Sequence, residues 1–367
     1  MLAAMSSPGG KRAVNAVVAL LVLASLTSAL GAGAATGAEP APGRLAYVTS
    51  SEAKPESLVW AALANGSEAR QLGPGNDPLL SPNGAWVAAS LLGTGSGRGP
   101  ALAVYPTSGA RPATLGEVAG QVALPLAWSP DSRYLAVSLG STALKGFVRK
   151  SGLAILDTAT GSLKTIATGI VNGAGFAPDG SDRVVFGRAS GESLGAPVNL
   201  YIAQASGAGL KRITSDGRSL NPVWGPRFIA YDRQRLRRNS APVYQLWLRG
   251  AGTGAARQLT FLHPNALVSG LMPLGFSSDG TRLLAEFVGQ DTSEAWTVQI
   301  ASGRARRIRV KGQGVTGAAI SRDGSRVLVT EGGIDGPADT GNVLTVPFAG
   351  GAPTRLVAHA AQPSWNE

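Results

Sequence analysis

Four arginine residues within six positions form the pattern that best indicates a binding site. They are Arg233, Arg235, Arg237 and Arg238, in the segment Asp232–Asn239. A guanidinium group presents paired N–H donors that match a phosphate or carboxylate group, so this segment predicts an anion-binding loop. The whole chain has a formal net charge of +11, which also favours anionic partners. The alternative is a solvated hairpin tip that binds nothing.

Candidate catalytic residues are scarce. The chain has no cysteine and only two histidines, His263 and His359, which argues against thiolate chemistry and against a zinc site. The segment Gly191–Gly195 matches the nucleophile-elbow pattern of hydrolases, but no strand–turn–helix sequence surrounds it. The segments expected to line a central channel are small or apolar, and Asp77 is their only acid. We therefore predict no catalytic residue, no metal and no cofactor.

A hydrolase is the alternative hypothesis. Glu192, Asp291, Glu294 and Asp335 lie in predicted long loops and could converge over the mouth of a channel. A glycosidase- or lactonase-type enzyme would use two such carboxyl groups, one of them with a raised pKa. A nucleic acid is not expected as a partner, because no aromatic residues are interleaved with the arginines to stack on bases.

A repeated turn defines the elements that would carry these residues. The pattern Ser-Pro-Asp-Gly, complete or degenerate, recurs about every 48 residues. Proline fixes φ at the second turn position, aspartate bonds to nearby backbone and glycine takes a positive φ, so each copy is typical of a hairpin. A large apolar residue precedes every turn: Leu80, Trp128, Phe176, Trp224, Phe276 and Ile320.

These repeats predict an all-β protein that forms a single β-propeller over residues 39–367. Six full units run roughly over residues 76–116, 122–169, 171–217, 219–262, 270–311 and 315–357. The strands expected at 44–49, 57–63 and 69–72 form a further unit without a first strand. Pro363–Asn366 supplies the missing strand, because Trp365 matches Trp224. We therefore expect seven four-stranded blades, closed by pairing of the N- and C-terminal strands.

The repeat resembles that of TolB-type propellers. The turns carry this resemblance together with Arg-x-Leu/Ile-Thr outer strands, such as Arg212–Thr214 and Arg257–Thr260, and it covers nearly all of residues 39–367. The same repeat occurs in the propeller domains of prolyl-oligopeptidase-like enzymes. TolB has six blades and an extra N-terminal α/β domain, which this sequence does not predict. Because the shared residues shape turns and strands, the resemblance implies a fold and no particular chemistry.

Residues 1–38 have the composition of a signal peptide. Lys11 and Arg12 precede the apolar run Ala13–Leu30, and small residues follow, with cleavage expected after Ala34 or Ala38. The alternative is an uncleaved membrane anchor, since the apolar run is just long enough to span a bilayer.

We therefore predict an exported, monomeric protein that is extracellular, periplasmic or associated with the cell envelope. It would be a non-catalytic module that binds a protein, a peptide or an anionic polymer. Its binding residues would lie on the long loops between the second and third strands of each unit.

Overall fold

A computed structural model describes residues 43–51, 54–91, 102–109, 121–142, 148–191, 195–237, 240–264, 269–289, 292–310, 315–331 and 341–367. The segment in which the signal peptide is predicted lies outside these residues. All regular elements in the described part are β-strands, so the all-β prediction is confirmed. In the same part, no helix is long and apolar enough to cross a membrane.

The strands follow one another as antiparallel meanders. The first half of the chain contains β1 (Arg44–Ser51), β2 (Lys54–Leu63), β3 (Arg70–Pro74), β4 (Asn76–Leu80), β5 (Trp86–Ser90), β6 (Leu102–Pro106), β7 (Gln121–Trp128), β8 (Tyr134–Thr142), β9 (Val148–Asp157), β10 (Ser162–Thr168), β11 (Val171–Phe176), β12 (Arg183–Ala189), β13 (Val198–Gln204) and β14 (Lys211–Arg212). The second half contains β15 (Ser219–Trp224), β16 (Phe228–Arg237), β17 (Ser240–Gly250), β18 (Ala256–Gln258), β19 (Ser269–Phe276), β20 (Arg282–Gly289), β21 (Thr292–Gln299), β22 (Ala305–Arg307), β23 (Val315–Ile320), β24 (Arg326–Glu331), β25 (Asn342–Pro347), β26 (Thr354–Ala358) and β27 (Ala361–Trp365).

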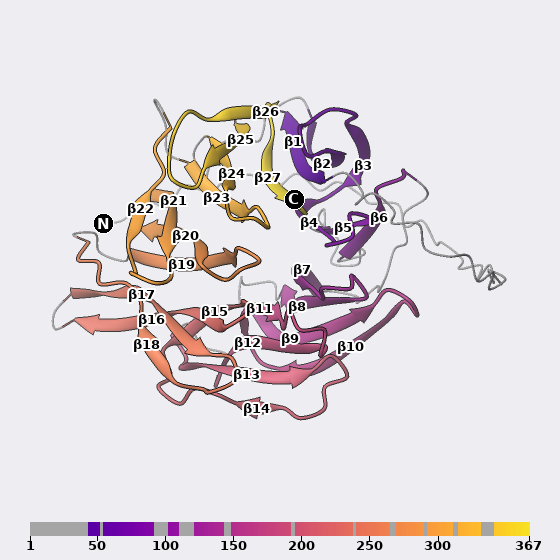
Figure 1. Cartoon of the computed structure of the whole chain (residues 1–367). Helices are drawn as coiled ribbons and strands as arrows, with labels where there is room; N and C mark the ends of the chain where they lie inside the picture. Colours follow the sequence, from indigo (N-terminus) through magenta and orange to yellow (C-terminus); the bar gives the residue numbers. More distant parts are fainter. Residues whose placement is uncertain are drawn as a thin grey trace, which may run out of the picture.

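The described strands form six hydrogen-bonded sheets arranged around a common centre (Figure 1). Four sheets have four strands each: β27-β1-β2-β3, β7 to β10, β11 to β14 and β23 to β26. One sheet has eight strands, because a parallel pairing of Tyr244 with Gly270 joins β15–β18 to β19–β22. The sheet β4-β5-β6 has three strands, and the outer strand expected near its end falls outside the described residues.

The innermost strands contact one another in succession. β4 contacts β7, β7 contacts β11, and the series continues through β15, β19 and β23 to β27, which contacts β4. β27 also pairs antiparallel with β1, with Trp365 opposite Leu45, so the predicted pairing of the terminal strands is present. Leu45 and Tyr47 of β1 pack with Leu328 of β24 in one apolar cluster, which joins the N-terminal sheet to the last full sheet.

The repeated turns owe their shape to a buried serine. Ser277 donates a hydrogen bond to Asp279 (2.6 Å) and accepts one from the backbone N–H of Arg282 (3.1 Å). The pKa of Asp279 is lowered to about 2, chiefly by the hydrogen bond from Ser277. The same pair of bonds recurs at Ser129 and Ser321. The turns that the sequence predicted are therefore fixed by local side-chain bonds.

Every innermost strand also carries a β-bulge, which the sequence did not predict. The register shifts at equivalent places, for example between Pro125 and Ala127 in β7 and between Pro273 and Gly275 in β19. In β4 and β15 the irregular stretch places Asp77 and Asn221 at positive φ (51° and 45°). Bulges bend a strand and increase its twist, which suits strands crowded around a narrow centre.

Candidate functional site

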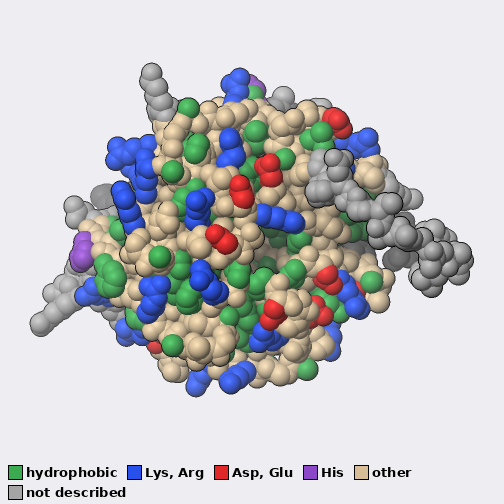
Figure 2. Space-filling model, in the orientation of Figure 1, with side chains coloured by type: hydrophobic (Ala, Val, Ile, Leu, Met, Phe, Trp, Pro, Cys, Tyr) green, Lys and Arg blue, Asp and Glu red, His purple; other side chains and the backbone are tan. Residues whose placement is uncertain are grey.

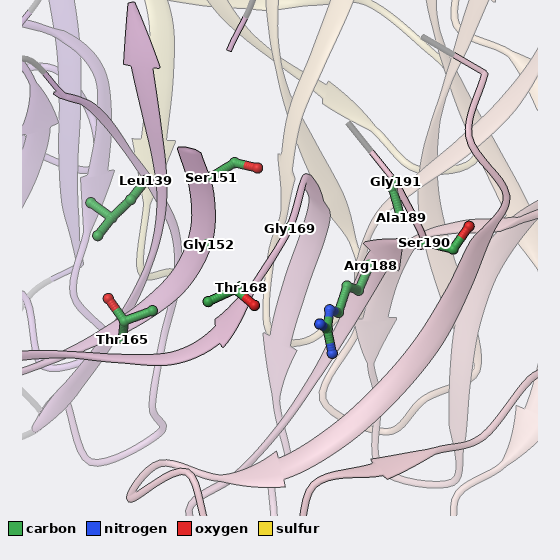
Figure 3. Close-up of a pocket in the computed structure, with 10 residues that line it drawn as sticks. All are labelled: Leu139, Ser151, Gly152, Thr165, Thr168, Gly169, Arg188, Ala189, Ser190 and Gly191. Atoms are coloured by element: carbon green, nitrogen blue, oxygen red, sulfur yellow. The ribbon is translucent and has the colours of Figure 1, made fainter. Parts of the chain in front are cut away.

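A pocket of about 480 Å³ lies between the sheet β7–β10 and the sheet β11–β14. It sits where second strands pass into third strands, at the opposite end of the sheets from the Ser–Asp turns. This is the end at which the sequence predicted function. The lining residues are Leu139, Ser151, Gly152, Thr165, Thr168, Gly169, Arg188, Ala189, Ser190 and Gly191. Figure 3 shows Leu139, Ser151 and Thr165 on one side, Arg188 and Ser190 on the other, and Thr168 between them.

Two glycines leave room for this pocket. Gly169 has a φ of 109°, and its N–H donates to the carbonyl of Ser151 (2.7 Å), which brings the end of β10 to the start of β9. A Cβ at Gly169 would lie 3.5 Å from Nε of Arg188, and one at Gly152 would lie 2.6 Å from the carbonyl oxygen of Ala167. A larger residue at either position would crowd the wall of the pocket.

Arg188 supplies the positive charge of the pocket. Its side chain is half-buried, and its guanidinium carbon lies 5.6 Å from the centre of the Tyr201 ring, a cation–π distance. No acidic residue in the described part of the chain forms an ion pair with it. Within the same described ranges, the hydroxyl groups of Ser151, Thr165, Thr168 and Ser190 make no hydrogen bond. The described lining of the pocket thus offers one cation and several hydroxyl groups to a ligand.

The arginines singled out in the sequence lie elsewhere. Arg233 on β16 forms an ion pair with Asp216 (3.0 Å), and its guanidinium stacks 4.5 Å from the ring of Trp247. Arg235 follows on the same face of the strand and is exposed. The side chain of Arg237 and all of Arg238 fall outside the described residues. Arg233 therefore has structural partners, and the binding role of this loop stays a prediction.

The loop carboxylates of the enzyme hypothesis are not seen together. Glu192, Asp291 and Asp335 lie outside the described residues. Glu294, on β21, forms an ion pair with Arg307 (3.0 Å) and accepts a hydrogen bond from the Trp296 indole (3.2 Å). Its carboxylate therefore already has two partners, on the outer part of the sheet.

Two buried carboxyl groups were missed by sequence reasoning. Asp232 pairs with Leu220 and Glu286 pairs with Met272, so the two acids occupy equivalent positions in neighbouring four-strand units. Burial raises the pKa of each to about 7. The only signal in the sequence is an acid at the end of an apolar run, as in Leu283–Glu286.

These two groups are poorly placed for catalysis. Asp232 is 1% exposed and Glu286 is 8% exposed, and neither lines the pocket. Asp232 accepts a hydrogen bond from the Asn221 amide at one oxygen (2.9 Å), while its other oxygen has no partner among the described residues. Asp77, the acid that the sequence placed near the channel, is on β4, and burial also raises its pKa.

Positive charge outside the pocket is dispersed. Figure 2 shows Lys and Arg side chains scattered over the visible face, with a few acidic side chains among them. A second pocket of about 430 Å³ lies beside β22 and includes Arg306, Arg307 and Arg309. Arg306 donates to the carbonyl of Ala349, whereas Arg307 turns to Glu294. Arg306 and Arg307 thus turn to different partners, as expected for neighbours on a strand.

Comparison with known proteins identifies the fold. No protein-family model matches the sequence, and no curated protein is significantly similar to it. Among solved structures, TolB from Acinetobacter baumannii is similar at 16% identity and a TM-score of 0.51, over 88% of this chain and 66% of TolB. The β-propeller domain of the Trilobed protease from Pyrococcus furiosus, which has an open velcro topology, is similar at 12% identity and a TM-score of 0.61, over 87% of this chain and 93% of that one. A prolyl endopeptidase is similar at 12% identity and a TM-score of 0.62, over 85% of this chain and 48% of the enzyme.

The fold is that of a TolB-like β-propeller, and the resemblance noted in the sequence is confirmed. This chain spans just under two thirds of TolB and about half of the prolyl endopeptidase. At 12–16% identity these similarities establish the fold alone.

Proposed function

We propose that this chain is a non-catalytic propeller that binds an anionic partner on the face containing the second-to-third-strand loops. The observation that carries the proposal is the pocket around Arg188, a guanidinium with no acidic partner among the described residues, surrounded by hydroxyl groups. A protein or peptide ligand is favoured, and an anionic envelope polymer is the alternative ligand. The exposed Arg235 and the adjoining Arg237 and Arg238 would extend the basic surface.

We infer that the propeller has seven blades and forms a closed ring. The succession of contacts from β4 through β23 to β27 and back to β4 supports this arrangement, and so does the pairing of β27 with β1. We infer further that the protein is exported, because residues 1–38 have the order of charged, apolar and small residues that a signal peptide requires. We also infer that it is a monomer.

The hydrolase alternative has less support. Glu294 is held by Arg307, and the buried Asp232 and Glu286 are inaccessible to a substrate. A general acid must come within hydrogen-bond reach of the reacting group, which these carboxyl groups do not offer.

The test is binding of the purified protein to immobilised acidic peptides, poly-L-glutamate and polygalacturonate at physiological salt. We expect saturable binding to at least one of these probes, weakened at least tenfold by Arg188→Ala, since a hydrogen-bonded charge contributes about 1.5–3 kcal/mol. The matched control is Arg227→Ala, which removes the same charge from an exposed turn between β15 and β16. Absence of binding to every probe would refute the proposal, and so would equal weakening by the two substitutions.

A further inference from the structure

We propose that the pocket at Arg188 binds the C-terminal carboxylate of an extended polypeptide that lies along β10. The inference rests on the proposed anion-binding function and specifies its ligand. It depends on the charge of the pocket, on the neutral groups around that charge and on the strand that leads to it.

The charge of the pocket matches a monoanion. Among the described residues that line the pocket, Arg188 is the only charged side chain. A phosphodiester chain or polyphosphate would bring several negative charges to this single cation, whereas a terminal carboxylate brings one. The planar guanidinium can donate two parallel N–H bonds to the two carboxylate oxygens. Its contact with Tyr201 already restricts the orientation of the guanidinium group, so the side chain loses less conformational entropy on binding.

The neutral lining suits the end of a peptide better than a sugar. The hydroxyl groups of Ser151, Thr168 and Ser190 can donate to a carboxylate oxygen or accept from the last peptide N–H. Leu139 offers an apolar contact to the terminal side chain. Among the described lining residues there is no aromatic side chain of the kind on which a sugar ring would stack. Its volume of about 480 Å³ lies in the range of small-ligand sites.

β10 provides a strand edge that ends in this pocket. It is the outer strand of its sheet and pairs only with β9 among the described strands. With seven residues it is longer than the other described outer strands, of which the longest have five. Its residues Ser162, Lys164 and Thr168 are exposed. An extended peptide can add to such an edge through main-chain hydrogen bonds.

The direction of β10 fixes the direction of the peptide. Thr165 and Thr168 of β10 both line the pocket, which lies at the C-terminal end of the strand. A peptide running parallel to β10 would therefore place its own C-terminus beside Arg188. Capture of a terminal carboxylate next to an added strand is a known means of peptide recognition.

The test compares two peptide arrays of identical sequences, one with free C-terminal carboxylates and one with C-terminal amides. Binders are then measured by fluorescence anisotropy with the whole protein. We expect amidation to weaken binding at least tenfold. Arg188→Ala should remove the difference between acid and amide, and Arg188→Lys should retain part of it. Arg227→Ala should leave the difference unchanged. N-methylation at alternate backbone positions should weaken binding of a peptide that adds as a strand.

The outcomes separate this inference from the proposed function. Equal binding of acids and amides, still sensitive to Arg188→Ala, would overturn the inference and leave an anion-binding propeller. Binding of polygalacturonate with no binding of any peptide would show that the ligand class is wrong. If neither peptides nor anionic polymers bind, the proposed function itself fails.

Discussion

Asp232 and Glu286 each place a carboxyl group inside the propeller without a cationic partner among the described residues. Burial raises the pKa of each group to about 7, from ordinary values near 4. The folded state therefore holds these protons more tightly than the unfolded chain does. It follows that the free energy of unfolding falls as the pH rises from about 4 to about 7, and that this stabilisation is lost once both groups ionise.

The substitution Asp232→Asn tests this linkage. It keeps an oxygen that can accept from Asn221 but removes the ionisation, so we expect the thermal midpoint to rise by roughly 2–4 °C at pH 8. At pH 4 the midpoint should rise much less, because Asp232 is then protonated in the folded state and about half protonated in the unfolded chain. Thermal unfolding followed from pH 4 to pH 8 measures both effects. Glu68→Gln, at an exposed position, is the control for lost surface charge. Wild-type pH dependence in Asp232→Asn would contradict the assignment.

At the level of single elements, the repeated turn depends on one hydroxyl group. Ser277 is buried and links the side chain of Asp279 to the backbone of Arg282. We expect Ser277→Ala to cost about 1–2 kcal/mol, because it removes the partner of the Arg282 N–H and one of the hydrogen bonds that Asp279 accepts. It should also raise the pKa of Asp279 toward its ordinary value, which NMR titration would measure. An exposed serine, Ser206, provides the matched control as Ser206→Ala. Equal costs for the two substitutions would show that the hydroxyl group is dispensable.

These turns could be predicted from the sequence because their bonds lie within six residues of chain. The degenerate copy at Trp224–Gly225 differs because it depends on a contact with another repeat. A Cβ at Gly225 would lie 2.5 Å from the ring of Phe276, a residue of the next repeat, so the position cannot hold the usual serine. The bulges of the innermost strands depend in the same way on neighbouring sheets, and no local sequence pattern predicts them.

The candidate site was harder to predict than the fold for the same reason. Arg233 stood out in a run of arginines, but its partners are Asp216, on the preceding loop, and Trp247, on the next strand. Arg188 is a single arginine near the end of a strand whose central residues are apolar, and it gives no signal. Its importance arises only where the end of β10 meets β12. Spacing along the chain identifies residues of one hairpin, whereas this pocket is made by two adjacent sheets.

Across the whole molecule, β27 connects parts of the chain that are far apart in sequence. Ser364 accepts a hydrogen bond from the backbone N–H of Leu80 (3.0 Å), and Gln362 accepts one from that of Asp77 (2.8 Å). Asn366 accepts from the N–H of Arg44 (2.7 Å). The sequence indicated this role only through the similarity of Trp365 to Trp224. These bonds join the C-terminal strand to β1 and β4, and the pairing with β1 covers an edge of that strand that would otherwise be open.

Removal of residues 361–367 should therefore affect more than the sheet that loses a strand. The deletion exposes the edge of β1 and removes the buried Trp365, a loss of about 3–5 kcal/mol by itself. We expect a lower thermal midpoint and a broader transition, because the first and last sheets can then separate before the rest unfolds. Circular dichroism and calorimetry measure the midpoint and the cooperativity.

A synthetic peptide of residues 361–367 distinguishes a propeller that lacks one strand from a misfolded chain. If the truncated protein keeps its other sheets, the peptide should fill the vacant edge of β1 and raise the midpoint with increasing concentration. The same peptide with Trp365→Ala should restore less stability, since the indole packs against the N-terminal sheet. Truncated protein that unfolds at the wild-type midpoint, with or without peptide, would show that the pairing of β27 with β1 contributes nothing to stability.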